Sequence, residues 1–72
     1  MSEEKTLLQS KILELWHISR TALANQNIPI SRYDRLLYIK NQLNKDNPEL
    51  ITKFSPKQLW LEISKTTLVI NN

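Results

Sequence analysis

Cysteine and glycine are absent from this sequence of 72 residues, and histidine occurs once, as His17. Without cysteine the chain cannot form a disulfide framework, a zinc site with thiolate ligands or a Cys/His nucleophile pair. Without glycine it lacks the backbone that lets phosphate groups approach closely in P-loops and dinucleotide-binding loops. A single imidazole also excludes motifs that need two histidine ligands. These absences remove the common routes to metal binding, nucleotide hydrolysis and nucleophilic catalysis.

The remaining candidates for chemistry do not form a recognisable active site. His17 lies inside the first predicted helix, where a partly exposed histidine needs no catalytic role. The acidic residues Glu14, Asp34, Glu49 and Glu62 are spread over four segments, and we interpret them as structural, solvated groups rather than an acid/base pair. We therefore expect no catalytic residue, no metal and no cofactor, and predict that the protein is not an enzyme. The enzymatic arrangements left open are a Ser/His/acid set, two carboxylates brought together by folding, and a site shared between subunits.

The sequence also lacks a long apolar run. No stretch approaches the roughly 20 consecutive apolar residues of a membrane span, and the acidic start, residues 1–4, is unlike the basic start of a signal peptide. Together with the absence of cysteine, this favours a cytoplasmic protein without membrane contact. A chain of this length forms one domain, and such a small domain buries only roughly 60% of its unfolded surface. We expect marginal stability.

Apolar residues recur at helical spacing over most of the chain. The pattern predicts an all-α fold, a compact bundle of three main helices plus a short fourth helix, in a single domain of residues 1–72. The predicted helices cover residues 3–25, 32–44, 48–53 and 56–67. The predicted core-facing positions are Leu8, Ile12, Leu15, Ser19, Ala22 and Leu23 in the first helix, Tyr33, Leu36, Leu37, Ile39 and Leu43 in the second, and Leu59, Trp60 and Ile63 in the last.

Polar residues mark the predicted helix boundaries. Ser2, Ser31 and Ser55 each stand where a side-chain oxygen can cap a helix start, and Asn47 is a fourth candidate cap, followed by proline. Because glycine is absent and asparagine occurs seven times, we expect helices to end at asparagine. The uncharged, largely β-branched segment 66–70 leaves three alternatives: a continued helix, an extended tail over the core, or pairing with a partner's sheet edge.

The sequence carries more apolar residues than a three-helix core of this size needs. Leu13 falls on the expected water side of the first helix, while Leu61 and Leu68 lie opposite the core-facing positions of the last. We therefore hypothesise a small non-enzymatic interaction module, an adaptor, inhibitor or small subunit, that binds another protein or itself through these two helices. The predicted contact residues are Leu13, Trp16, Arg20, Trp60, Leu61 and Leu68. Ordinary scattered exposed leucines are the competing interpretation.

Basic and amide side chains on the second predicted helix support an alternative function, binding of DNA or RNA mainly through the phosphate backbone. The expected outward face of this helix combines Arg, Asn and Gln, which can bond base edges, with Lys, which contacts phosphate. Lys53 and Lys57 flank a helix start whose free N–H groups favour anions. The predicted nucleic-acid contacts are Arg32, Arg35, Tyr38, Lys40, Asn41, Gln42, Lys45, Lys53 and Lys57. A solvated polar face would give the same pattern, so protein binding remains the first hypothesis.

Overall fold

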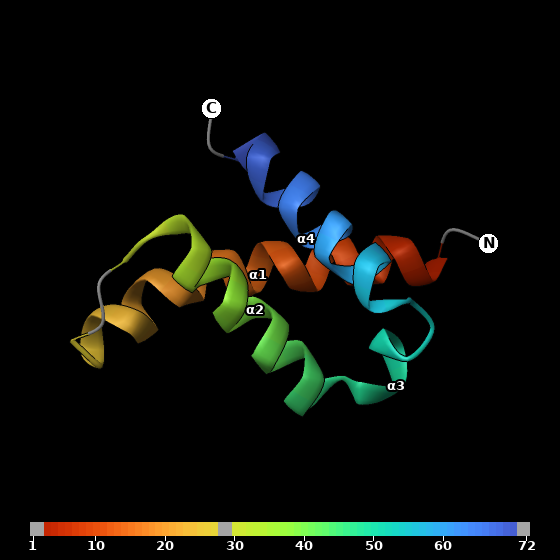
Figure 1. The fold of residues 1–72 in the computed structure, drawn as a ribbon, viewed down its shortest axis with the longest axis horizontal. Helices are drawn as coiled ribbons and strands as arrows, with labels where there is room; N and C mark the ends of the chain where they lie inside the picture. The colour runs from red at the N-terminus through yellow and green to blue at the C-terminus, as the bar shows by residue number, and fades with distance from the viewer. Residues whose placement is uncertain (1–2, 28–29, 71–72) are drawn as a thin grey trace.

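The computed structural model of the protein describes residues 3–27 and 30–70. Over these residues the chain forms four helices and no strand, which confirms the predicted all-α fold with three main helices and a short fourth (Figure 1). The helices are α1 (Glu3–Asn25), α2 (Arg32–Asp46), α3 (Pro48–Ile51) and α4 (Pro56–Ile70).

The predicted helix boundaries differ from the observed ones in three places. Helix α1 occupies the predicted range, whereas α2 continues two residues further, to Asp46, and α3 ends two residues earlier, at Ile51. Helix α4 continues three residues further, to Ile70. Of the three alternatives for residues 66–70, the structure has the continued helix. The predicted cap Ser2 lies outside the described residues.

Serine side chains begin two of the helices as predicted. The Oγ atom of Ser31 accepts a hydrogen bond from the backbone N–H of Asp34 at 3.1 Å and donates one to the Asp34 carboxylate at 2.6 Å. The Oγ atom of Ser55 accepts from the N–H of Gln58 at 3.1 Å. Asn47 departs from the prediction, because its side chain makes no cap bond to α3; its N–H instead donates to Leu43 O and closes α2. Short polar side chains therefore set the starts of α2 and α4.

Asparagine takes the place of glycine at the end of α1. Asn27 has φ of 59°, a left-handed conformation that asparagine tolerates better than other non-glycine residues. Its N–H donates to Ala24 O, and the N–H of Gln26 donates to Leu23 O, each at 3.1 Å. These bonds satisfy carbonyl groups that the helix end would otherwise leave open. The expected role of asparagine is confirmed here.

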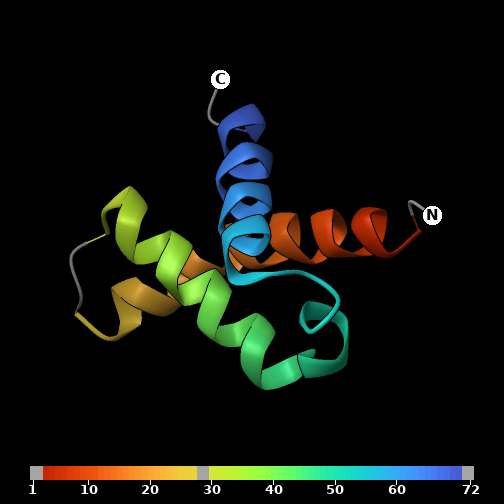
Figure 2. The ribbon, with the colours of Figure 1, turned by 45° about the vertical axis from the view of Figure 1, so that its right-hand side comes forward.

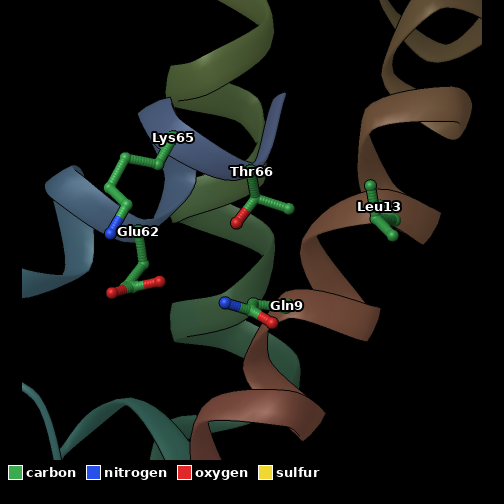
Figure 3. Close-up of a pocket in the computed structure, with 5 residues that line it drawn as sticks. All are labelled: Gln9, Leu13, Glu62, Lys65 and Thr66. Carbon is green, nitrogen blue, oxygen red and sulfur yellow. The ribbon is translucent and has the colours of Figure 1, made fainter. Parts of the chain in front are cut away.

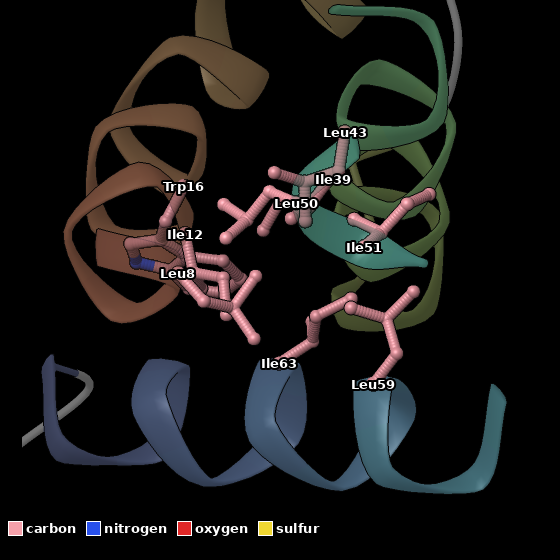
Figure 4. Close-up of a cluster of buried hydrophobic side chains, with 9 residues drawn as sticks. All are labelled: Leu8, Ile12, Trp16, Ile39, Leu43, Leu50, Ile51, Leu59 and Ile63. Carbon is pink, nitrogen blue, oxygen red and sulfur yellow. The ribbon is translucent and has the colours of Figure 1, made fainter. Parts of the chain in front are cut away.

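The core lies where α1, α2, α3 and the first half of α4 meet (Figure 4). Its members are large apolar side chains, namely Leu8, Ile12, Trp16, Ile39, Leu43, Leu50, Ile51, Leu59 and Ile63. Figures 1 and 2 show α4 crossing α1, with the C-terminal turns of α4 extending away from the other helices. Only the first half of α4 contributes to this apolar cluster, although Thr67 further along the helix is also fully buried.

The inward face of α2 is rotated relative to the predicted one. Ile39 and Leu43 are buried and Leu36 packs against the core, as predicted, but Tyr33 is 65% exposed. Tyr33 precedes Ile39 by six residues, which is far from a whole number of helical turns. Arg35 precedes Ile39 by four residues, about one turn, and so lies on the inward side. The predicted core position of Tyr33 is therefore wrong.

Candidate interaction surfaces

One side of α4 points away from the core and carries two of the predicted contact residues. Leu61 and Leu68 are 50% and 55% exposed, and their spacing of seven residues places them about two turns apart on one side of the helix. Lys57 and Lys65 are exposed on the same side. The remaining ionisable residue of α4, Glu62, is 1% exposed, so the charge that α4 displays is positive. We call Lys57, Leu61, Lys65 and Leu68 the α4 face.

The structure separates the other predicted contact residues. Trp16 follows the buried Ile12 by one turn and is itself buried in the core, so in this conformation it cannot contact a partner. Trp60 is half-buried, and the Lys40 Nζ atom lies 5.9 Å from the centre of its ring. Arg20 is exposed on α1.

An open pocket of about 290 Å³ lies where α4 crosses α1 (Figure 3). Its lining residues are Gln9 and Leu13 from α1, and Glu62, Lys65 and Thr66 from α4. Leu13 keeps about two fifths of its surface exposed there, so the pocket has an apolar wall. Lys65 belongs both to this pocket and to the α4 face, so the pocket adjoins that face. This places the predicted residue Leu13 next to the α4 face.

Glu62 is a buried carboxylate at the crossing of α1 and α4, not the solvated surface acid that the sequence predicted. Its Oε2 atom accepts a hydrogen bond from the Gln58 side-chain amide at 3.0 Å and lies 3.5 Å from Lys5 Nζ on α1. Its Oε1 atom is buried without a hydrogen-bond partner. The prediction failed because it considered only partners on α4, whereas the cation comes from another helix.

Two predicted nucleic-acid contacts, Arg35 and Arg32, instead join helices within the molecule. The Arg35 guanidinium donates to Ser19 Oγ at 2.9 Å and to Trp16 O, and its central carbon lies 3.5 Å from the centre of the Trp16 ring. Burial, with a smaller contribution from the charge of Arg20, lowers the pKa of Arg35. Arg32 donates to Ser64 O at 3.0 Å. The predicted outward position of Arg35 is therefore wrong.

Lys53 is also paired within the molecule. Its Nζ atom donates to a carboxylate oxygen of Glu4 at 2.8 Å. This hydrogen bond and the attraction between the charges lower the pKa of Glu4 and raise the pKa of Lys53. Both side chains are about half-exposed, so the pair joins α1 to the segment after α3 at the surface. A phosphate group at Lys53 would have to compete with Glu4.

The other predicted nucleic-acid contacts differ in their exposure. Tyr38, Lys40 and Gln42 are half-buried, whereas Asn41, Lys45 and Lys57 are exposed. Lys57 belongs to the α4 face, and the other five lie on α2. Tyr38 and Asn41 line a shallow hollow that also includes Asp34, whose carboxylate is unfavourable to phosphate. The positive groups that remain accessible are thus divided between two helices.

His17 lies on an exposed part of α1. It lines a shallow hollow with Ile18, Thr21, Ala22 and Asn25, all of them uncharged. Over residues 3–27 and 30–70 no group of three or more His, Cys, Asp or Glu side chains is placed to hold a metal ion. In the same part of the chain no helix is long and apolar enough to cross the bilayer. Among the residues that the structure describes, no acid is hydrogen-bonded to His17.

A second apolar surface was missed by the sequence analysis. Leu7 and Ile18 on α1 are 48% and 45% exposed. Their spacing of eleven residues is close to three full turns, so both lie on one side of the helix. Lys11 and Glu14 stand between them and pair with each other at 3.9 Å. The sequence signal that could have revealed this surface is the spacing of four, three and four residues between these four positions. We call Leu7, Lys11, Glu14 and Ile18 the α1 face.

Comparison of the chain with protein-family models, with curated proteins and with solved structures finds no match. The class of the molecule therefore follows from its own geometry, which over the described residues is that of a compact all-helical fold. Its candidate functional features are the α4 face, the adjoining pocket and the α1 face.

Proposed function

We propose that the protein is a small non-enzymatic interaction module that binds an acidic amphipathic helix of another protein through the α4 face. The observation that carries the proposal is the pairing of two half-exposed leucines with two exposed lysines on the side of α4 that points away from the core. Amphipathic helices dock through apolar anchor residues that are separated by whole helical turns. The two exposed leucines of the α4 face have this spacing.

The charge of the α4 face supports an acidic partner. Lys57 and Lys65 flank Leu61 by four residues on either side, one turn in each direction. Because Glu62 is buried, no carboxylate of α4 offsets these ammonium groups at the surface. Complementary charges at the rim of an interface select the partner and its register and speed association, while the buried apolar anchors supply most of the affinity.

The pocket beside Lys65 supports a side chain of the partner entering between α1 and α4. Leu13 and the methyl group of Thr66 offer apolar contact there (Figure 3), and its volume of about 290 Å³ is ample for one side chain. Leu61 and Leu68 are half-exposed, and Lys65 belongs both to the α4 face and to the pocket, so a helix docked along this face adjoins the pocket. The cysteine-free composition supports a reducing, cytoplasmic location.

Affinity capture from cells that contain the protein tests this function. The wild type is expected to retain a stoichiometric partner, and the double variant Leu61→Ser, Leu68→Ser is expected to lose it, because each substitution removes a central apolar anchor. Ile30→Ser is the matched control, since Ile30 is exposed to a similar extent, at 45%, and lies outside both the α4 face and the α1 face. A synthetic helix from the captured partner should then bind the wild type directly.

The same experiment decides between protein and nucleic acid. The nucleic-acid alternative predicts a different result. Nuclease treatment would abolish retention, and retention would fall steeply as salt rises but would survive the two leucine substitutions. Equal retention of the partner by wild type and by the double leucine variant would refute the α4 face as the binding site. Circular dichroism of each variant controls for loss of the helices.

A further inference from the structure

The α1 face has a pattern that complements itself. Its members Leu7, Lys11, Glu14 and Ile18 follow one another at intervals of four, three and four residues, the spacing of the contact positions in a helix pair. The two apolar residues stand at the ends of the face, and a base and an acid stand at its centre. A partner helix that runs in the opposite direction and carries the same sequence would meet each residue type with its complement.

Antiparallel pairing of two α1 helices brings these complements together. When Leu7 of one copy faces Ile18 of the other, Lys11 of the first copy faces Glu14 of the second. Two-fold symmetry repeats both contacts, so the pair contains two apolar contacts and two oppositely charged contacts. Parallel pairing gives no such match, since it sets Lys11 beside Lys11 and Glu14 beside Glu14.

We infer that a second copy of the chain docks on the α1 face and forms an antiparallel, two-fold symmetric dimer. Leu7 and Ile18 lie outside the residues that build the core, so each keeps close to half of its side chain free for this contact. Lys11 and Glu14 are 39% and 61% exposed, and their pairing at 3.9 Å within one chain is loose enough to be exchanged for a pair between chains.

The α4 face does not offer the same self-complementarity. Its charged members are both lysines, and an antiparallel pairing that sets Leu61 against Leu68 brings the Lys65 side chains of the two copies together near the symmetry axis. Like charges at that place oppose pairing. The charge patterns of the two surfaces therefore assign a second copy to the α1 face and leave the α4 face to a different protein.

The dimer is expected to be weak. Helix α1 has 23 residues and is about 35 Å long, and each copy contributes two large apolar side chains, which is less than a standard interface of roughly 800 Å² per partner usually provides. In sedimentation equilibrium the mass should rise from 8.5 kDa toward twice that value between about 10 µM and about 1 mM. A mass that stays at that of the monomer over this range overturns the inference.

Reversal of the central charges tests the register. Glu14→Lys sets two lysines against two lysines across the symmetry axis, and Lys11→Glu sets acids against acids, so each single variant should associate about tenfold more weakly. The double variant K11E/E14K restores opposite charges and should return to within about twofold of the wild type. A mixture of the two single variants should form mixed dimers, because every contact between them is then complementary.

Single cysteines test the direction of the helices, since the chain has no cysteine of its own. A mixture of the Leu7→Cys and Ile18→Cys variants should form the mixed disulfide on mild oxidation, because a disulfide requires Cα atoms within about 7 Å. Leu7→Cys alone should not cross-link at the same rate. Faster cross-linking between two copies of L7C than in the mixture would indicate parallel pairing and overturn the inference.

The test is independent of the proposed function. Leu61→Ser, the control for the α1 face, lies on α4 and is exposed to the same extent as Leu7, at 50% against 48%. It should weaken partner capture and leave the mass distribution unchanged, whereas Ile18→Ser should abolish association without removing the α4 anchors. An unchanged association constant in both E14K and I18S overturns the dimer and leaves the proposed function of α4 standing.

Discussion

Replacement of Arg35 by alanine removes the guanidinium group that joins α2 to α1. Two hydrogen bonds and the stacking on Trp16 are lost. Each bond from a partly exposed charged donor contributes about 1 kcal/mol, and the cation–π contact contributes about 1 kcal/mol more. The free energy of unfolding should therefore fall by about 2–3 kcal/mol, out of roughly 4–11 kcal/mol for a domain of this size. The melting temperature should fall by about 10–20 °C.

Urea unfolding followed by circular dichroism measures this loss. Lys45→Ala on the same helix is the control, and it should change the free energy of unfolding by less than about 0.5 kcal/mol because Lys45 is exposed. A double-mutant cycle with Ser19→Ala should show a coupling of about 1 kcal/mol. An Arg35→Ala variant as stable as the wild type, with no coupling to Ser19, would refute the assignment of Arg35 to the helix interface.

Three further changes test other parts of the molecule. Ser31→Ala should lower the free energy of unfolding by about 1 kcal/mol in a urea titration, because the N–H of Asp34 loses its cap; Ser10→Ala, in mid-helix, is the control. Glu62→Met should leave the free energy of unfolding equal or raise it by about 1–2 kcal/mol, since it removes a buried carboxylate oxygen without a partner. Lys5→Met should lower it by about 1–3 kcal/mol, because it leaves the buried Glu62 carboxylate without its cation. A large loss of stability in E62M would contradict this reasoning. Pairing with Lys53 lowers the pKa of Glu4 from its ordinary value of 4.5. The Glu4 carboxylate therefore stabilises the folded protein above pH 4.5, and this stabilisation is lost as the pH falls through the lowered pKa. Pairing with Glu4 raises the pKa of Lys53 from its ordinary value of 10.5. The Lys53 ammonium therefore stabilises the folded protein below pH 10.5, and this stabilisation is lost as the pH rises through the raised pKa. In urea titrations, the free energy of unfolding of Lys53→Met should therefore be lower than that of the wild type at neutral pH, and the two values should converge at both extremes of pH.

The helices were predictable from the sequence because their signals are local. Ser31 and Ser55 are caps that bond a backbone N–H three residues ahead. At the end of α1 the backbone of Asn27 is left-handed, a conformation that asparagine tolerates. The extra turn of α4 was not predictable, since β-branched residues near a helix end are compatible with more than one conformation. Helix α3 also packs against α2 and α1, contacts that local sequence signals do not reveal.

The surfaces were only partly predictable, because burial depends on which helices meet. Leu61 and Leu68 were correctly placed on the outward side of α4, since their position follows from periodicity within one helix. Arg35 and Glu62 were misplaced, because a charged residue in a helical pattern is normally assigned to solvent. Their burial requires partners on α1, namely Ser19 for Arg35 and Lys5 for Glu62, and no pattern within one helix identifies such partners.

The two proposed contacts use different helices, and their combination has a consequence for binding. A dimer formed through α1 carries two copies of the α4 face, so it engages a surface that displays several partner helices at two points. Ile18→Ser should then weaken retention on a densely coated surface by more than tenfold, although affinity for a single partner helix in solution stays the same. Equal retention of I18S and wild type on the dense surface would show that dimerisation does not contribute to binding there. A loss of affinity in solution as well would show that the two surfaces are coupled through α1 and the crossing with α4, where Lys5 and Glu62 meet.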